Sequence, residues 1–249
     1  MKFCKTMSVR VRIWGAGWCL AGAGTVGAAT LAVPNSSFES PTPPPGYPAS
    51  PLVDVWQKAP QPAGIPLPGG ITWDQLAGVF PNTPAGAADH IDNMDGQQAG
   101  YLFAIPGVAL FQKLSSRFEV GNSYALTLGV LGAGGITEGS TLQLGLYYTD
   151  DTQQPVTVAS TVVTYVPAAF PTVTHLLDQT AGLATVTAGD AWAGREIGVQ
   201  IVSTFGTGAG YWDIDNARIS VVPEPGAVGL FAVGGVAVWM RSRRHAGAR

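Results

Sequence analysis

The sequence predicts an all-β protein built as a jelly-roll-like β-sandwich. Residues 33–222 are rich in Val, Thr, Ser and Gly, and they lack the runs of Lys, Glu and Leu that helices favour. Apolar and polar residues alternate in several segments, so that Leu142, Leu144 and Leu146 would share one face of a strand. Clusters of Gly, Asn and Asp separate these segments. Many short strands with regular turn signals are typical of sandwiches and jelly rolls.

The expected strands span residues 101–105, 109–118, 123–128, 141–148, 156–166, 172–177, 196–204 and 211–221. Two proline-rich segments, residues 41–51 and 59–70, are expected to be loops within the same domain. About 190 residues lie between 33 and 222, which is typical of one all-β domain. We therefore divide the chain into a signal segment (1–32), a β-sandwich ectodomain (33–222) and a sorting segment (223–249).

The N-terminal segment has the pattern of a secretory signal peptide. Basic residues come first, and an apolar stretch rich in Gly and Ala spans residues 13–29. Small residues near its end suit cleavage before Thr30 or before Val33, and both positions stay open. The alternative is an N-terminal helix that is not cleaved. Both cysteines, Cys4 and Cys19, fall in this segment, so the mature chain would contain no thiol or disulfide.

The C-terminal segment has three parts: a proline-flanked acid, an apolar stretch and a basic end. Residues 226–240 carry no charge and, with the residues before them, just reach the length of a single transmembrane helix. Arginines follow this stretch and favour a cytoplasmic end. We therefore expect attachment to a membrane through this segment. The residues that define the pattern are Pro223, Glu224, Pro225, Arg241, Arg243 and Arg244.

This arrangement resembles the PEP-CTERM sorting signal of Gram-negative bacteria. The resemblance implies that the partner is an exosortase-type membrane peptidase, which processes the chain near Pro223, Glu224 and Pro225. It also implies transient anchoring in the inner membrane, followed by export to the cell surface, the outer membrane or the extracellular matrix. The alternative is a plain C-terminal membrane anchor with a chance pair of prolines.

The charge of the middle segment excludes one class of partner. Residues 33–222 contain 5 basic and 15 acidic residues, a net charge of −10. Such a domain repels phosphate backbones, so we expect no binding to nucleic acid. Cations and neutral polymers such as polysaccharides are compatible with this charge.

A second resemblance concerns the two ends of the ectodomain. Residues 35–39 read Asn-Ser-Ser-Phe-Glu, and residues 212–219 form an Asp-rich closing segment. This pairing resembles jelly-roll carbohydrate-binding modules and galactose-binding-like domains. The resemblance implies a structural Ca²⁺ held by Glu39 and Asp213, with Asp215 as a further candidate. Calcium takes six to eight oxygen ligands and relieves repulsion between neighbouring carboxylates. The alternative is that these acids cap turns or pair with a surface arginine.

An extracellular polysaccharide is the expected ligand, and four residues are candidates for holding it. Asp92 and Asp95 lie in the densest polar loop of the chain, residues 89–96. Trp73 and Trp192 stand beside acids near loops, where an indole could stack on a sugar ring. The alternatives are a solvated loop and two tryptophans that belong to the core.

We find no motif for catalysis and expect a protein that is not an enzyme. The ectodomain has neither an HExxH metal motif nor a Gly-x-Ser-x-Gly elbow. The expected role is that of an exported carbohydrate-binding or adhesive module. A secreted polysaccharide hydrolase and an architectural matrix protein without a small ligand are the alternatives. A His/Asp or Glu pair at the floor of one cleft would favour the hydrolase.

Overall fold

The computed structural model describes residues 28–67 and 69–224. Most of the signal segment and the sorting residues from Pro225 onward lie outside the described residues. The apolar stretch of the predicted signal peptide lies almost wholly outside the described residues as well, and so does the predicted transmembrane helix with Arg241, Arg243 and Arg244. Within the described residues, no helix is long and apolar enough to cross a membrane.

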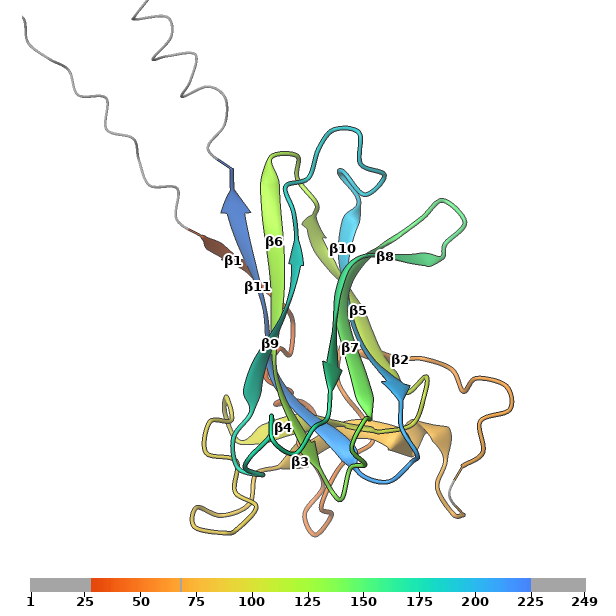
Figure 1. Cartoon of the computed structure of the whole chain (residues 1–249), viewed down its shortest axis with the longest axis vertical. Helices are drawn as coiled ribbons and strands as arrows, with labels where there is room; N and C mark the ends of the chain where they lie inside the picture. The colour runs from red at the N-terminus through yellow and green to blue at the C-terminus, as the bar shows by residue number, and fades with distance from the viewer. Residues whose placement is uncertain (1–27, 68, 225–249) are drawn as a thin grey trace, which may run out of the picture.

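Two antiparallel sheets form a jelly-roll-like β-sandwich, which confirms the predicted fold class (Figure 1). The first sheet, sheet A, runs in the order β3 (Ala77–Pro81), β4 (Gln98–Phe103), β11 (Tyr211–Pro223), β6 (Asn122–Ala133) and β9 (Leu177–Leu183), and β1 (Ala29–Leu31) also pairs with β11. The second, sheet B, runs in the order β2 (Gln57–Lys58), β5 (Ala109–Arg117), β10 (Glu196–Phe205), β7 (Thr141–Thr149) and β8 (Pro155–Thr164). One short 3-10 helix, η1 (Trp73–Leu76), precedes β3.

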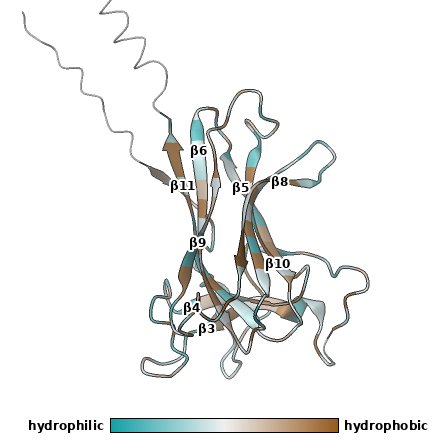
Figure 2. Ribbon diagram, viewed as in Figure 1, coloured by the Kyte–Doolittle hydropathy of each residue, from teal (hydrophilic) through white to brown (hydrophobic). Residues whose placement is uncertain are grey.

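The core lies between the two sheets and follows from the alternation in the strands. Leu142, Leu144 and Leu146 are fully buried on the inner face of β7, and Trp212 and Ile214 are fully buried on β11. Hydrophobic and hydrophilic residues follow one another along the strands (Figure 2). The strand period of two residues therefore leaves every second side chain available for the outer faces.

Most of the longer strands match the predicted segments, but β1, β2 and β3 were not predicted, and one predicted segment is displaced. The segment 172–176 was predicted as a strand but is a loop, and β9 begins only at Leu177. The side chain of Asn93 bonds to the backbone of Leu176, so a loop contact takes the place of strand pairing there. β9 has exposed residues at alternate positions and contains few β-branched residues. The shortage of β-branched residues weakens the strand signal in its sequence.

The two ends of the described chain lie side by side (Figure 1). β1 is antiparallel to the end of β11, with Ala29 opposite Val221 and Leu31 opposite Ile219. The sandwich therefore begins before residue 33 and ends at Pro223. One of the two predicted cleavage positions, before Thr30, lies inside β1, whereas the other, before Val33, lies just after it.

Candidate functional site

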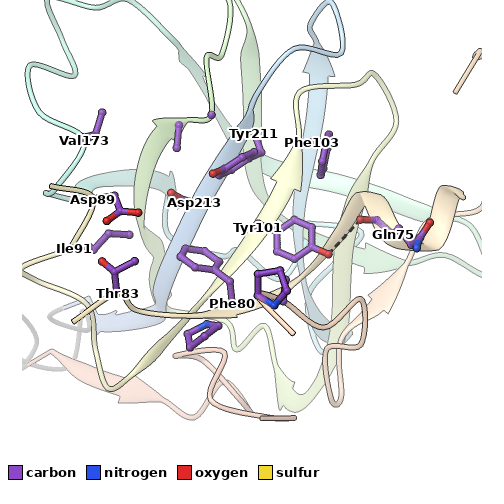
Figure 3. A pocket seen from close by; sticks show the side chains of 15 residues that line it. Gln75, Phe80, Thr83, Asp89, Ile91, Tyr101, Phe103, Val173, Tyr211 and Asp213 are labelled. Atoms are coloured by element: carbon purple, nitrogen blue, oxygen red, sulfur yellow. Dashed lines mark hydrogen bonds between the residues drawn. The ribbon is translucent and has the colours of Figure 1, made fainter. Parts of the chain in front are cut away.

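A cavity of about 640 Å³ opens on the outer face of sheet A, where β3, β4 and β11 lie next to one another (Figure 3). Its volume is in the range of small-molecule sites. The register of β11 against β4 brings the lining residues together: Tyr211 lies opposite Phe103, and Asp213 lies opposite Tyr101. These four side chains alternate with core residues such as Trp212, so all of them point outward together.

Aromatic rings from three strands form one side of the wall. The rings of Tyr101 and Phe103 meet edge to face with centroids 6.2 Å apart, and those of Phe103 and Tyr211 are 6.0 Å apart. Phe80 adds a fourth ring from β3. Such contacts hold the rings in place, because aromatic pairs add about 0.5–1.5 kcal/mol beyond the burial of their surface. The wall is therefore preformed.

Glycine and a main-chain carbonyl fix the position of Tyr101. Its hydroxyl donates to the carbonyl oxygen of Gln75 at 3.2 Å, and burial raises the pKa of Tyr101 to about 12. A Cβ at Gly78, directly opposite Tyr101, would lie 2.7 Å from the phenol oxygen. Any side chain at Gly78 would thus displace the ring. η1 supplies Gln75, whose side-chain oxygen accepts the N–H of Thr72 at 2.8 Å.

Asp213 is the unusual group of the cavity. Its residue is only 4% exposed, and its Oδ1 atom is buried without a hydrogen-bond partner. Burial raises the pKa of Asp213 well above its usual range, because a buried carboxylate without a counter-charge is costly. Burial therefore favours the neutral, protonated carboxyl, which can donate a hydrogen bond to a ligand.

Other polar groups surround this acid. The hydroxyl oxygen of Thr83 is a second buried atom without a partner, and Thr83 also lines the cavity. Exposed Asp89 lies in the lining as well. The pKa of Tyr211 is raised by burial and, to a lesser extent, by the charges of Asp213 and Asp89. None of the described residues in the lining is basic. The cavity therefore favours neutral or cationic groups over anionic ones.

A separate group of acids joins the opening segment to the closing strand. Oε1 of Glu39 accepts the N–H groups of Gln97 and Gln98, each at 2.8 Å. Asp215 is fully buried, and its Oδ2 accepts the N–H of Asp95 at 2.6 Å. Burial is the main cause that raises the pKa of Asp215 to about 7. Backbone N–H bonds oppose this shift, and the charges of Asp95 and Glu39 add to it.

The predicted calcium ligands are therefore divided between two places. Glu39 and Asp215 approach the same loop around Asp95, whereas Asp213 lies in the aromatic cavity. The pairing of β4 with β11 explains the division: it ends at Ile214, so Asp215 lies beyond the aromatic side chains of β4. Within the described residues, no group of three or more acidic, His or Cys side chains has the spacing of a metal site.

The polar loop 89–96 forms hydrogen bonds with neighbouring segments of the chain. The N–H of Asp92 donates to the carbonyl of Thr174 at 2.8 Å, and Ser37 donates to Oδ2 of Asp95 at 2.6 Å. Asp92 and Asp95 do not line the cavity, although Asp89 and Ile91 of the same loop do. Their predicted role in ligand binding stays a prediction.

The two predicted tryptophan platforms lie against the core. The indole N–H of Trp73 donates to the carbonyl of Ala59 at 2.7 Å, and the rings of Trp73 and Trp192 both pack on the hydrophobic cluster. Neither lines the cavity. The aromatic wall was not predicted from the sequence. Its only local signal is the spacing of two residues within each strand, Tyr101 with Phe103 and Tyr211 with Asp213.

No protein-family model matches the chain, and no curated protein matches it. Among solved structures, the apo form of a cyclase from Fischerella sp. is 19% identical, with a TM-score of 0.61 over 80% of this chain and 98% of that chain. A Stig cyclase from Fischerella sp. TAU, in complex with (3Z)-3-(1-methyl-2-pyrrolidinylidene)-3H-indole, is 20% identical, with a TM-score of 0.61 over 80% of this chain and 100% of that chain. The CBM22-1 xylan-binding domain from Paenibacillus barcinonensis is 12% identical, with a TM-score of 0.39 over 67% and 85%. At these identities the likeness shows the jelly-roll-like fold alone.

Proposed function

We propose that this chain is an exported β-sandwich protein that binds a neutral carbohydrate in the cavity on β3, β4 and β11. The observation that carries this proposal is the buried carboxyl of Asp213, which has an unpartnered oxygen among aromatic rings. A buried polar atom normally has a partner in the folded protein. A ligand hydroxyl or ring oxygen supplies one, and the rings of Tyr101, Phe103 and Tyr211 pack against the apolar face of the sugar.

The charge of the cavity supports a neutral sugar rather than an acidic one. Asp89 and Asp213 are its charged or ionisable acids, and no basic side chain of the described lining offsets them. An anionic ligand would be repelled by the charge of these acids. It could be accommodated beside Asp213 only if that carboxyl stayed protonated, which would cost free energy. A neutral ring instead accepts a hydrogen bond from the protonated carboxyl. The hydroxyl of Thr83 serves a second polar group of the same ligand.

Export rests on the two terminal segments. We expect the signal segment to be removed and an exosortase-type peptidase to process the chain near Pro223, Glu224 and Pro225. The end of the sandwich supports this expectation, since β11 stops at Pro223 and the N–H of Glu224 donates to the carbonyl of Gly121 at 2.8 Å. The sorting motif thus begins where the folded domain ends.

A pair of tyrosine variants tests the cavity. The mature protein is screened on an array of neutral glycans, and the best ligand is titrated by calorimetry. Tyr211→Ala removes part of the aromatic wall and should weaken binding by up to about tenfold, since aromatic contacts are worth about 0.5–1.5 kcal/mol. Tyr47→Ala, at a tyrosine that is 67% exposed outside the cavity, is the control and should bind normally. Equal affinity in both variants, or no neutral glycan bound, would overturn the proposal.

The same geometry favours one second function, that of a polysaccharide hydrolase. A carboxyl with a raised pKa is suited to act as a general acid, and Asp89 is a second acid in the same cavity. The test is release of reducing sugar from the glycan that binds. If catalysis occurs, Asp213→Asn should abolish it, because an amide is not acidic enough to protonate a leaving oxygen. Binding without any release of sugar would leave the chain a binding protein.

A further inference from the structure

A second cavity of about 420 Å³ lies on the outer face of sheet B, and the register of three strands builds it. In one row across the sheet, Gly198 of β10 lies between Lys113 of β5 and Tyr147 of β7. In the next row, Gln200 of β10 lies beside Phe111 of β5. These side chains share the outer face, because the residues between them on each strand point into the core. We call this cavity the sheet B groove.

Glycine makes the floor of the sheet B groove flat. A Cβ at Gly198 would overlap the ring of Tyr147, so the ring lies directly against the sheet only because residue 198 has no side chain. At Gly145, a Cβ would lie 2.7 Å from the carbonyl oxygen of Ala159. The ring of Tyr147 is buried, and burial raises its pKa, so the phenol stays neutral. The floor thus presents flat apolar surface with neutral polar edges.

The electrostatics of the groove centre on one ammonium group. Among the described basic side chains, Arg117 pairs with Glu196 at 3.5 Å, Arg195 with Asp151 at 2.7 Å, and Arg218 with Asp178. Lys58 donates to main-chain carbonyls, including that of Ala77 at 2.7 Å. Lys113 alone has no hydrogen bond or salt bridge within the part of the chain that the structure describes, and it is exposed.

The acids near Lys113 already have partners. Lys113 also borders a neighbouring crevice that contains Asp150, Asp151 and Glu196. Glu196 and Asp151 are held by arginines, and Oδ1 of Asp150 accepts the N–H of Gln154 at 2.9 Å. No acidic residue lines the sheet B groove itself. In a domain whose net charge is −10, this groove is therefore a local site for an anionic group.

We propose that the sheet B groove binds an acidic sugar, namely a uronic acid unit of a polysaccharide. The ammonium of Lys113 pairs with the sugar carboxylate. Phe111, which is partly buried, packs against the sugar ring, and the side-chain amides of Gln57, Gln153 and Gln200 bond to hydroxyl groups. Gln200 is already oriented by the bond from its Nε2 to the hydroxyl of Thr157 at 2.8 Å. This site does not depend on the first cavity, which lies on the other sheet and favours neutral ligands.

The test compares ligands that differ only in charge. The mature protein is titrated by calorimetry at low ionic strength with an oligogalacturonate and with its methyl ester, which keeps the sugar ring but removes the negative charge. We expect the acid to bind about fivefold more tightly than the ester, the size of effect of one partly exposed ion pair. The preference should fade as salt is added, because salt screens exposed charges.

Two variants identify the group responsible. Lys113→Gln should make acid and ester bind alike, whereas Arg218→Gln makes the same change in net charge at a paired residue of sheet A, outside the groove, and should keep the preference. Tyr211→Ala, in the first cavity, should also keep the preference for the acid over the ester. The proposals for the two sites can therefore be refuted separately. The proposal is overturned if neither an oligogalacturonate nor an oligomannuronate binds. An unchanged preference in Lys113→Gln, or tighter binding of poly-glutamate than of the sugar acid, would overturn it as well.

Discussion

At the scale of single residues, the environment of Asp213 sets the chemistry of the first cavity. Asp213 and Asp215 lie two positions apart on one strand and look equivalent in the sequence. Asp215 accepts backbone N–H groups with both oxygens, whereas Oδ1 of Asp213 has no partner. Desolvation raises the pKa of both carboxyls. Only Asp213 combines a raised pKa with a place in the lining of a cavity, which is why it can present a proton to a ligand.

Asp213 should make the folded protein less stable as the pH rises. Its pKa in the fold is above the unfolded value, so between these two values the folded chain holds a proton that the unfolded chain has lost. Each pH unit in this window lowers the free energy of unfolding by about 1.4 kcal/mol. Asp213→Asn stays neutral in both states and should remove this contribution. We expect its stability relative to the natural chain to increase from pH 4 to pH 8.

Urea denaturation at pH 4, 6 and 8 measures this difference. Asp215 is present in both the natural chain and the variant and contributes the same pH dependence to each. The comparison therefore isolates residue 213. Asp178→Asn is a suitable control, because Asp178 is exposed and pairs with Arg218 at the surface. A difference between Asp213→Asn and the natural chain that is the same at all three pH values would contradict a neutral buried carboxyl.

At the scale of elements, strand alternation predicts most of the sandwich, but register determines the sites. The runs 141–148 and 211–221 alternate clearly, and β7 and β11 occupy them. Nothing local indicates that Tyr101 of β4 faces Asp213 of β11, because this contact depends on pairing between strands distant in the sequence. The same applies to Lys113 and Tyr147 in the sheet B groove. Side-chain direction could be predicted, whereas the neighbours across the sheet could not.

The meeting of the opening segment with β11 leads to a prediction about calcium. We propose that Glu39 and Asp215 hold a structural Ca²⁺, since the structure brings both to the loop around Asp95. Without calcium, Asp215 favours the protonated state, with a pKa of about 7. Its stabilising contribution is then full at low pH and is lost as the pH rises through about 7. Calcium needs the ionised carboxylate, so its effect should grow across the same window.

Thermal unfolding in about 1 mM calcium and in chelator, at pH 5 and pH 8, tests this site. The melting temperature should rise with calcium, and the rise should be larger at pH 8. Glu39→Gln should remove the effect, whereas Glu138→Gln, at an exposed loop acid, should retain it. Identical melting temperatures with calcium and with chelator at both pH values would exclude a structural calcium ion here.

At the scale of the whole molecule, the two ends of the sandwich lie together at the C-terminal end of β11, a central strand of sheet A. β1 covers residues 219–221 of β11, immediately before the predicted sorting motif at Pro223. The two predicted processing events would therefore act on adjacent parts of the fold. The position of the N-terminal cut decides whether β11 keeps its partner there. Unpaired strand edges invite pairing with other chains, so the cut also affects self-association.

The pairing of β1 with β11 favours cleavage before Thr30 over cleavage before Val33. A chain that begins at Thr30 keeps Thr30 and Leu31 opposite Ser220 and Ile219, and Leu31 packs against the core. A chain that begins at Val33 loses these contacts and should be less stable by about 1–2 kcal/mol, from lost hydrogen bonds and partly buried apolar surface. Urea midpoints of the two chains, each ending at Glu224, measure the difference, and light scattering reports association through the open edge. Equal midpoints with no added association would mean that β1 does not stabilise the mature protein. In that case, the fold would give no reason to prefer one cleavage position over the other.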